Sequence, residues 1–287
     1  MKSLTILISS FDNFSDCWKP YLHGLKKYWP DCPYDIFIIT NYKDVEDGRA
    51  KAIKVGDDKG WSRNMLEALK HIDTPYIFCT QEDFWIQKPV NTGVIEDYIA
   101  IMKQDKADYI RLFPAPPPNY DFPDDWRLGI IADEAPYRTS LQVALWRKAI
   151  LQELIIPNEN PWHFELRGTI RSRKYGERFL CVKRFFDEKN QPYHYGVDYV
   201  CTAINKGRWS KAAKEYARSE GLQIDFTNRP NENWWHDFTR SSWFGVFCGR
   251  IVYLLDRSAR NPEKIMKEIK NPVKLLKEIY HRMFYQL

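Results

Sequence analysis
The sequence predicts an α/β fold, and two observations lead to that prediction. In the first half of the chain, short apolar runs alternate with segments whose apolar residues recur at helical spacing, as in strands and helices that follow one another. The chain has 287 residues, 44% hydrophobic and 28% charged, so it can bury a large core and is not a disordered protein. This length fits one large domain or two small ones.

Apolar runs predict five strands in the first half. They span residues 4–9, 35–40, 52–55, 76–80 and 108–113. The run at 76–80 is apolar throughout, which predicts a strand buried on both faces. Helical spacing predicts helices over 15–29, 61–72 and 91–104, with Ser62 as the cap of the second. The proline-rich stretch 114–119 predicts an extended loop.

The second half is less regular. We expect a helix from Leu141 to about Leu154 and a polar, aromatic loop over residues 157–165 that reaches toward a substrate. Near residue 230 the composition shifts to tryptophans and then to a lysine-rich tail, so we place a domain boundary there. Apolar residues and lysines in the tail recur on opposite sides of expected helices, which suits an anionic membrane surface. A surface helix with its lysines in solvent explains the same pattern, and both interpretations stay open.

Two adjacent carboxylates, Glu82 and Asp83, directly follow the buried strand at 76–80. This position puts two anions at the open edge of a sheet, where carboxylate oxygens can hold a divalent cation that bridges a nucleotide diphosphate. Many strands end in an acidic turn that binds nothing, so the pair alone does not decide the function.

Charge and cysteine content exclude some classes of protein. The net charge of +5 is modest and the basic residues form no long blocks, so we expect no nucleic-acid partner. The six cysteines include no Cys-x-x-Cys pair, which favours a reducing compartment. Residues 1–8 predict a first strand rather than a signal peptide, and no run reaches the roughly 20 apolar residues that span a bilayer. We expect a cytoplasmic protein, with peripheral attachment to the inner face of the cell membrane left open.

Taken in order, three short motifs resemble those of a GT-A glycosyltransferase. They are the first strand and its end at 5–12, the helix start Gly60-Trp61-Ser62-Arg63-Asn64, and the acidic turn Gln81-Glu82-Asp83-Phe84. Two further stretches, 140–147 and 159–165, are similar to bacterial enzymes of that class that build capsular and lipopolysaccharide glycans. The resemblance covers about residues 3–230. It implies a Rossmann-like mixed sheet flanked by helices in residues 1–230, with residues 231–287 as a C-terminal helical extension.

In that fold the nucleotide lies across the carboxyl ends of the first strands. The resemblance assigns the end of the first strand to the base and ribose. It assigns the helix start to the diphosphate, because a helix N-terminus and a guanidinium both favour phosphate. An Arg63 exposed to solvent without a ligand is the ordinary alternative. The residues implied in donor binding are Ser9, Ser10, Phe11, Asp12, Asp57, Asp58, Arg63, Asn64 and Glu82.

The usual metal motif of the family is Asp-x-Asp, and Gln81 replaces its first carboxylate. The resemblance implies Mg²⁺ or Mn²⁺ held by Asp83 and Glu82, with His194 or His236 completing the shell. An ordinary structural role is the alternative for either histidine. Because an amide is a poor ligand for these cations, Gln81 argues against tight metal dependence.

Sugar transfer with inversion needs a base that takes the proton of the acceptor hydroxyl. The resemblance places Glu165 on the acceptor side, and we predict that Glu165 is this base. A structural role, in which Glu165 caps a helix or pairs with Arg167, is the alternative. Asp133 and Glu134 are the reserve candidates.

These residues predict an enzyme that moves one sugar from a nucleotide-sugar donor, with UDP the expected nucleotide, to a glycan or lipid-linked acceptor in cell-surface polysaccharide biosynthesis. A catalytically silent assembly subunit that binds a partner transferase is the alternative, and Gln81 favours it. A nucleotidyltransferase would carry a glycine-rich phosphate loop after the first strand, and residues 10–14 lack one.

Overall fold

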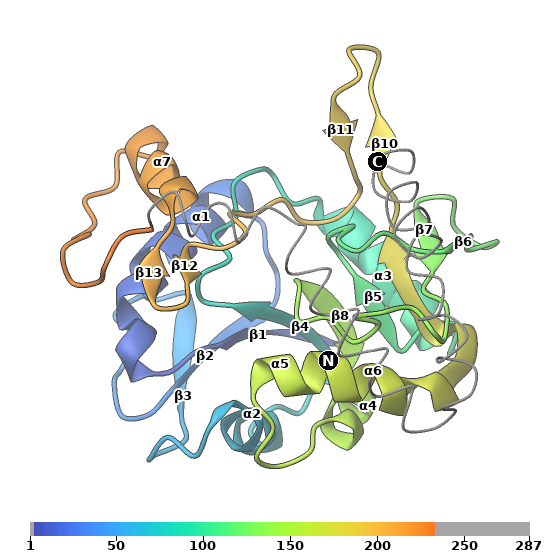
Figure 1. The fold of residues 1–287 in the computed structure, drawn as a ribbon, viewed down its shortest axis with the longest axis horizontal. Coiled ribbons are helices and arrows are strands. Elements are labelled where there is room, and N and C mark those ends of the chain that lie inside the picture. The colour runs from blue at the N-terminus through green and yellow to red at the C-terminus, as the bar shows by residue number, and fades with distance from the viewer. Residues whose placement is uncertain (1–2, 233–287) are drawn as a thin grey trace, which may run out of the picture. The chain divides into compact units, whose positions relative to one another are not determined.

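The computed structural model of the chain describes residues 3–232. These residues form a nine-stranded mixed sheet with helices on both faces (Figure 1). The strand order across the sheet is β3-β2-β1-β4-β8-β5-β9-β7-β6. This architecture confirms the predicted α/β class. The predictions for the C-terminal extension, for its membrane-facing helices and for His236 lie outside the described residues.

The first half of the sheet is parallel. Its strands are β1 (Leu4–Ser9), β2 (Asp35–Thr40), β3 (Ala50–Lys54) and β4 (Tyr76–Gln81). Strand β1 lies between β2 and β4, and Ser9 at its end is level with Gln81 of β4. Helix α1 (Trp18–Tyr28) connects β1 to β2, and α2 (Trp61–Lys70) connects β3 to β4. Since parallel strands end at the same edge, the carboxyl ends of β1 and β4 lie side by side.

The second half of the sheet is mixed. Its strands are β5 (Tyr109–Arg111), β6 (Tyr120–Asp121), β7 (Leu128–Ile130), β8 (Ala144–Arg147) and β9 (Phe179–Val182). Strand β8 runs antiparallel to both β4 and β5 and joins the two halves. The helix predicted from Leu141 is therefore wrong over its first part, because α4 spans only Lys148–Leu154. Central strands are apolar on both faces, so the sequence of β8 does not show the alternation that identifies a half-exposed strand.

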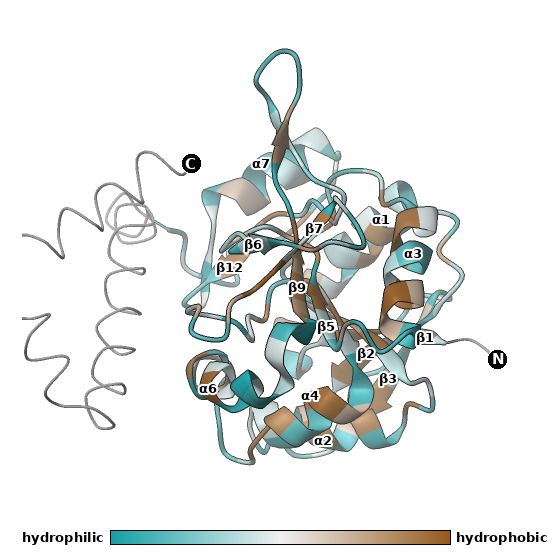
Figure 2. Ribbon diagram, turned by 90° about the vertical axis from the view of Figure 1, so that its right-hand side faces the viewer, coloured by the Kyte–Doolittle hydropathy of each residue, from teal (hydrophilic) through white to brown (hydrophobic). Residues whose placement is uncertain are grey.

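Each face of the sheet has its own core, because successive side chains of a strand point to opposite faces. On one face, Ile6 and Phe78 pack among residues of α1, α3 (Thr92–Lys103) and α7 (Lys211–Ser219). On the other face, Leu7 and Ile77 pack among residues of α2 and α4. Figure 2 shows the resulting hydropathy, with apolar strands inside and mostly polar loops outside.

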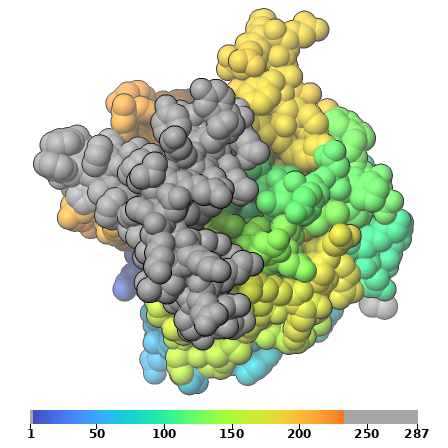
Figure 3. All heavy atoms as spheres, turned by 45° about the vertical axis from the view of Figure 1, so that its right-hand side comes forward, coloured from blue at the N-terminus to red at the C-terminus, as the bar shows by residue number. Residues whose placement is uncertain are grey.

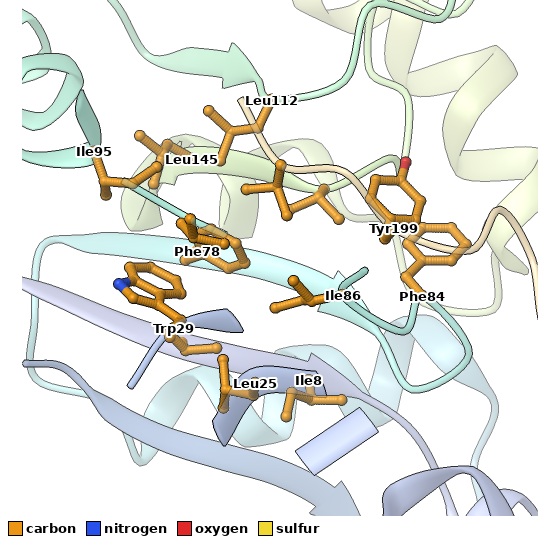
Figure 4. Packing of buried hydrophobic residues seen from close by; sticks show 14 of the residues in the cluster. Ile8, Leu25, Trp29, Phe78, Phe84, Ile86, Ile95, Leu112, Leu145 and Tyr199 are labelled. Atoms are coloured by element: carbon orange, nitrogen blue, oxygen red, sulfur yellow. The ribbon is translucent and has the colours of Figure 1, made fainter. Parts of the chain in front are cut away.

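Aromatic rings fill the first of these cores. Phe78 lies beside Trp29, with their ring centroids 5.5 Å apart, and near Leu145 of β8 (Figure 4). Phe84 stacks on Tyr199 with a centroid distance of 4.6 Å. The stacking joins the chain just after β4 to a segment that follows more than a hundred residues later. The carboxyl end of β4 is thus held by packing as well as by the sheet.

Short helical turns and two hairpins complete the described fold. The helical turns are Asp12–Cys17, α5 (Pro161–His163), Phe164–Gly168, α6 (Thr169–Arg171) and Ser172–Arg178. The hairpins are β10 (Phe185–Phe186) with β11 (Pro192–Tyr193), and β12 (Ile204–Asn205) with β13 (Arg208–Trp209).

Two local predictions need correction. The expected loop at 157–165 is helical from Pro161 onward, because Asn160 caps this segment by accepting a hydrogen bond from the backbone N–H of His163. Helix α2 begins at Trp61 with Gly60 as its N-cap, so Ser62 is not the cap. No helix within residues 3–232 combines the length and the apolar character needed to cross a membrane.

Candidate functional site
A pocket of about 280 Å³ lies at the carboxyl ends of β1 and β4. It brings together side chains from the ends of both strands, from the start of α2 and from Pro161 at the start of α5. Six residues predicted for donor binding line it: Ser9, Ser10, Phe11, Asp58, Asn64 and Glu82. Gln81, Trp61 and Phe14 also line the pocket. The parallel arrangement of β1 and β4 is what places two sequence-distant motifs in one site.

The two serines present hydroxyl groups whose orientation is set by tryptophans. The indole N–H of Trp61 donates to Ser9 Oγ at 3.2 Å, and that of Trp18 donates to Ser10 Oγ at 2.7 Å. Because an indole only donates, each serine oxygen serves as the acceptor and keeps its own hydrogen. The Ser10 hydroxyl lies 3.5 Å from the carbonyl oxygen of Phe11. Ser9 can therefore donate to an oxygen atom of a ligand.

The turn before α2 is closed by Asp58 and Asn64. Asp58 Oδ1 accepts from the backbone N–H of Gly60 at 2.9 Å and from Asn64 Nδ2 at 2.8 Å. Asn64 Oδ1 accepts from the backbone N–H of Lys59 at 3.2 Å. Gly60 has φ of 85°, a left-handed conformation that favours glycine. The turn thus fixes the Asp58 carboxylate at the wall of the pocket.

Gln81 and Glu82 form the polar end of the pocket on the β4 side. The Gln81 Nε2 atom is buried and has no hydrogen-bond partner among the described residues. Glu82 is 7% exposed, and burial, reinforced by the neighbouring Asp83 charge, raises the pKa of its carboxyl well above the usual range. A buried N–H group without a partner costs about 1–3 kcal/mol. A ligand that offers an acceptor to Gln81 would recover that cost.

Asp83 turns away from this pocket toward another segment of the chain. Its Oδ2 atom accepts from the Thr202 hydroxyl and, at 3.4 Å, from the backbone N–H of Ile204. Its backbone carbonyl accepts from the N–H of Ala203 at 2.9 Å. Asp83 therefore attaches the end of β4 to residues 202–204, and it does not line the pocket.

The predicted metal ligands are not brought together. Glu82 lines the pocket, Asp83 contacts residues 202–204, and His194 packs edge-on against Phe113 and lies 3.5 Å from an oxygen of Asp198. Within residues 3–232, no three histidine, cysteine, aspartate or glutamate side chains are arranged to hold a metal ion. The set of Asp83, Glu82 and His194 therefore does not fit a cation held by protein side chains.

Three other predicted donor-binding residues lie outside the pocket lining. The Asp12 carboxylate accepts from the backbone N–H groups of Asn41 at 2.8 Å and Tyr42 at 3.0 Å, so it holds the loop after β2. Asp57 accepts from the Tyr42 hydroxyl. Arg63 Nε donates to Asn158 Oδ1 at 2.9 Å. Each side chain stabilises a loop near the strand ends in this structure.

None of the three candidate bases lines the pocket. Glu165 Oε1 accepts from the backbone N–H of Leu141 at 2.8 Å and from Ser140 Oγ at 3.2 Å. Burial raises the pKa of the Glu165 carboxyl despite these hydrogen bonds. Asp133 forms an ion pair with Arg138 at 3.2 Å, and the adjacent Glu134 is exposed in the turn that follows β7. Glu165 follows Pro161, which lines the pocket, by one helical turn.

The sequence reasoning missed two features of the site. Gln81 was predicted only as a poor cation ligand, whereas it lines the pocket with an unpaired amide N–H group. Trp61 was predicted for the apolar face of its helix, whereas it lines the pocket and positions the Ser9 hydroxyl. Gln81 lines the pocket because it is paired in register with Ser9 at the end of β1. No signal in the sequence marks the role of Trp61.

The sequence matches no protein-family model, and a sequence search of the curated proteins finds no match. Among solved structures, the fold is similar to S. aureus TarS 1–349 in complex with UDP, with a TM-score of 0.43, 15% identity and coverage of 64% of this chain. This chain spans 58% of that protein. It is also similar to the galactosyltransferase LgtC in complex with donor and acceptor sugar analogues, with a TM-score of 0.41, 10% identity, and coverage of 76% of this chain and 95% of LgtC.

A third similar structure is the bifunctional IspDF from Campylobacter jejuni, with a TM-score of 0.36, 14% identity, and coverage of 67% of this chain and 52% of that one. The three likenesses concern the course of the chain. A function for this chain therefore has to be argued from the residues that line the pocket.

Proposed function
We propose that the chain is a nucleotide-sugar-dependent glycosyltransferase, with UDP the expected nucleotide. The observation that supports this most is the pocket at the carboxyl ends of β1 and β4, where Ser9, Asp58, Gln81 and Glu82 converge. In open α/β sheets, ligands bind outside the carboxyl ends of the strands. We propose residues 1–230 as the transferase domain and residues 231–287 as its extension.

The pocket suits part of a nucleotide sugar. Its volume of about 280 Å³ is near the lower end of the range of about 300–1,000 Å³ for small-molecule sites. Phe11 and Trp61 offer apolar walls for a base, and the serines, Asp58 and Gln81 offer hydrogen bonds that orient it. The diphosphate and the sugar then extend out of the pocket. Arg63 stays our predicted phosphate ligand and must leave Asn158 to bind.

Glu165 remains our proposed base. Burial raises the pKa of its carboxyl, and Glu165 follows Pro161 of the pocket wall by one helical turn. A carboxylate with a raised pKa is a better acceptor for the proton of a hydroxyl group. Only one of its oxygens holds Leu141 and Ser140, and the other is left for an acceptor hydroxyl. Asp133 is the weaker candidate, because it is paired with Arg138.

We propose that the acceptor is a glycan or a lipid-linked sugar of cell-surface polysaccharide biosynthesis, such as capsule or lipopolysaccharide. The sequence motifs suggest this pathway. A cytoplasmic location and membrane attachment through the tail belong to the same proposal.

A catalytically silent assembly subunit is the second candidate function. The observation in its favour is that the described residues place no three metal-ligating side chains together while Gln81 replaces a carboxylate. Such a subunit would keep the fold and bind a partner transferase without releasing a nucleotide.

Thermal unfolding with UDP, GDP, CMP and TDP, each with and without Mn²⁺, tests the proposal. We expect one nucleotide to stabilise the protein by about 2.7 kcal/mol at 100 times its Kd, which is roughly 5–10 °C in Tm. Gln81→Ala and Ser9→Ala should weaken this shift. Glu67→Gln, a surface change on α2 outside the pocket, should not.

A measurement of nucleotide release distinguishes the two candidate functions. The transferase should release UDP slowly from a UDP-sugar even without an acceptor, whereas the silent subunit should bind UDP and release none. An unchanged Tm with all four nucleotides would contradict the proposed donor site.

A further inference from the structure
Outside the pocket, aromatic side chains gather where the β10–β11 hairpin leaves the sheet. Four of these rings contact one another. We call this group the aromatic shelf; it consists of Trp126, Phe185, Tyr193 and Tyr195. Trp126 is 59% exposed and Tyr193 39% exposed. Contiguous exposed apolar area is unusual on a soluble protein and marks a binding surface.

The rings of the shelf meet mostly edge-on. Trp126 meets Phe185 at 66° and Tyr195 at 79°, with centroid distances of 5.2 Å in both pairs. Tyr193 meets Tyr195 at 74°. Edge contacts hold the rings in place, and the large exposed fraction of Trp126 shows that much of its indole remains uncovered. The shelf therefore presents aromatic surface to a ligand.

The hairpin is fastened to the body at its base. The backbone N–H of Lys183 donates to the Arg127 carbonyl at 2.8 Å, and the Tyr98 hydroxyl donates to the Tyr195 carbonyl at 2.8 Å. Lys183 also lies over the Phe185 ring at 5.8 Å. A surface that is already ordered loses little entropy on binding. Figure 3 shows the hairpin standing out from the neighbouring surface.

The charges around the shelf are mixed. Lys183, Arg184 and Lys189 lie on the hairpin together with Asp187 and Glu188. Lys183 is in turn paired with Asp121 of β6 at 2.6 Å. Attraction to an anionic lipid surface needs an excess of lysine and arginine, which this region lacks. Aromatic rings among charged groups of both signs match instead a ligand with apolar faces and many hydroxyl groups.

The chain connects the shelf to the turn after β4, beside the pocket. It runs directly from Tyr195 to Tyr199, which stacks on Phe84 three residues after the end of β4. Thr202 then donates to Asp83, two residues after that end. One segment therefore carries Tyr193 and Tyr195 of the shelf and contacts the residues that directly follow Gln81 and Glu82 of the pocket lining.

We infer that the aromatic shelf binds sugar units of an oligosaccharide acceptor at a distance from its reacting end. The inference rests on the proposed glycosyltransferase function, which supplies a glycan as the second substrate. The apolar C–H face of a pyranose packs on an aromatic ring, and the interspersed polar groups meet its hydroxyls. Binding at the shelf raises the effective concentration of the acceptor end at the site without any new contact at the reacting atoms.

Titration of the full chain with defined hexasaccharides tests the inference. The probes are maltohexaose, cellohexaose, mannohexaose and chitohexaose, with binding followed by saturation-transfer NMR and tryptophan fluorescence. We expect at least one hexasaccharide to bind, and the double variant Trp126→Ala/Tyr193→Ala to weaken its binding at least tenfold. Tyr193→Phe, which keeps the ring, should bind as the unaltered chain does. Ile156→Ala, at an exposed apolar side chain outside the shelf, is the matched control.

The outcomes are distinguishable from those for the donor site. The double variant should retain its circular dichroism spectrum and its stabilisation by nucleotide, because the shelf is not part of the pocket. Absence of binding by all four hexasaccharides, or binding that the double variant leaves unchanged, would overturn the inference while leaving the donor site intact. Binding of phosphatidylglycerol vesicles, or self-association in sedimentation, that depends on Trp126 without any hexasaccharide binding would also overturn it.

Discussion

Asp83 shows how the environment of a single side chain changes the meaning of a motif. Its carboxylate was predicted as the main metal ligand, yet it accepts hydrogen bonds from Thr202 and Ile204. These contacts connect the end of β4 to residues 202–204. At this position a loss of function can therefore result from a loss of local structure, and an experiment has to separate the two.

Asp83→Ala should lower the free energy of unfolding by about 1–3 kcal/mol, because it leaves buried donors without an acceptor. Asp83→Asn keeps one acceptor oxygen and should cost less. Urea denaturation, with activity measured on the same samples, separates this role from metal binding. If Asp83→Ala unfolds at the same urea concentration as the unaltered chain and loses only nucleotide affinity, the structural role is wrong.

The sequence predicted residues of the candidate pocket where a strand end alone decides their position. Ser9 ends β1 and Glu82 directly follows β4, so the direction of the strands placed them in the pocket. Asp12 and Arg63 stand at equally suggestive positions, but their side chains bind Asn41 and Asn158. Such partners depend on the path of distant loops, which no local pattern in the sequence records.

At the scale of elements, α1 and α7 are joined by one carboxylate. Glu220, at the end of α7, accepts from Lys27 at 2.8 Å, from Tyr28 at 2.6 Å and from His23 at 2.9 Å. Burial raises the pKa of Glu220, but these hydrogen bonds outweigh it and lower the pKa from 4.5 to about 2. The ionised carboxylate therefore favours the folded state.

Glu220→Gln should reduce the free energy of unfolding at neutral pH by about 1–2 kcal/mol, since it removes charge-assisted hydrogen bonds of which one partner, Lys27, is half-exposed. Because the pKa of Glu220 is lowered in the folded state, its contribution to the free energy of unfolding is complete above about pH 4.5. That contribution disappears as the pH falls toward 2. Urea denaturation at several pH values should show the difference from the unaltered chain shrinking over that interval. Glu215→Gln, on the exposed side of α7, should change stability by less than about 0.5 kcal/mol. A difference independent of pH would contradict the charge argument.

The elements that the sequence predicted well have one clear pattern each. The strands β1, β2 and β4 are apolar runs bounded by polar residues, and α3 has helical spacing with Asn91 as its cap. The strand β8 was predicted as helix because it is short, buried on both faces and directly followed by α4. Its identity as a strand depends on β4 and β5 on either side, which is tertiary information.

For the whole molecule, we expect stability to be graded from the middle of the sheet to its periphery. Backbone amides of β1 and β4, which are hydrogen-bonded on both sides within the sheet, should exchange with solvent only on global unfolding. Amides of the β10–β11 hairpin, whose strands have two residues each, should exchange by local opening. Native-state hydrogen exchange read by mass spectrometry checks this. Equal protection of the hairpin and β1 would contradict it.

The central position of β8 has a consequence for synthesis on the ribosome. Strand β4 ends at Gln81, but its partner on that side begins only at Ala144. At about 5–20 residues per second, several seconds pass before the partner is made. During that interval β4 exposes an unpaired apolar edge, which is a template for aggregation. We therefore expect the nascent chain to be most prone to aggregation before residue 147 has left the ribosome.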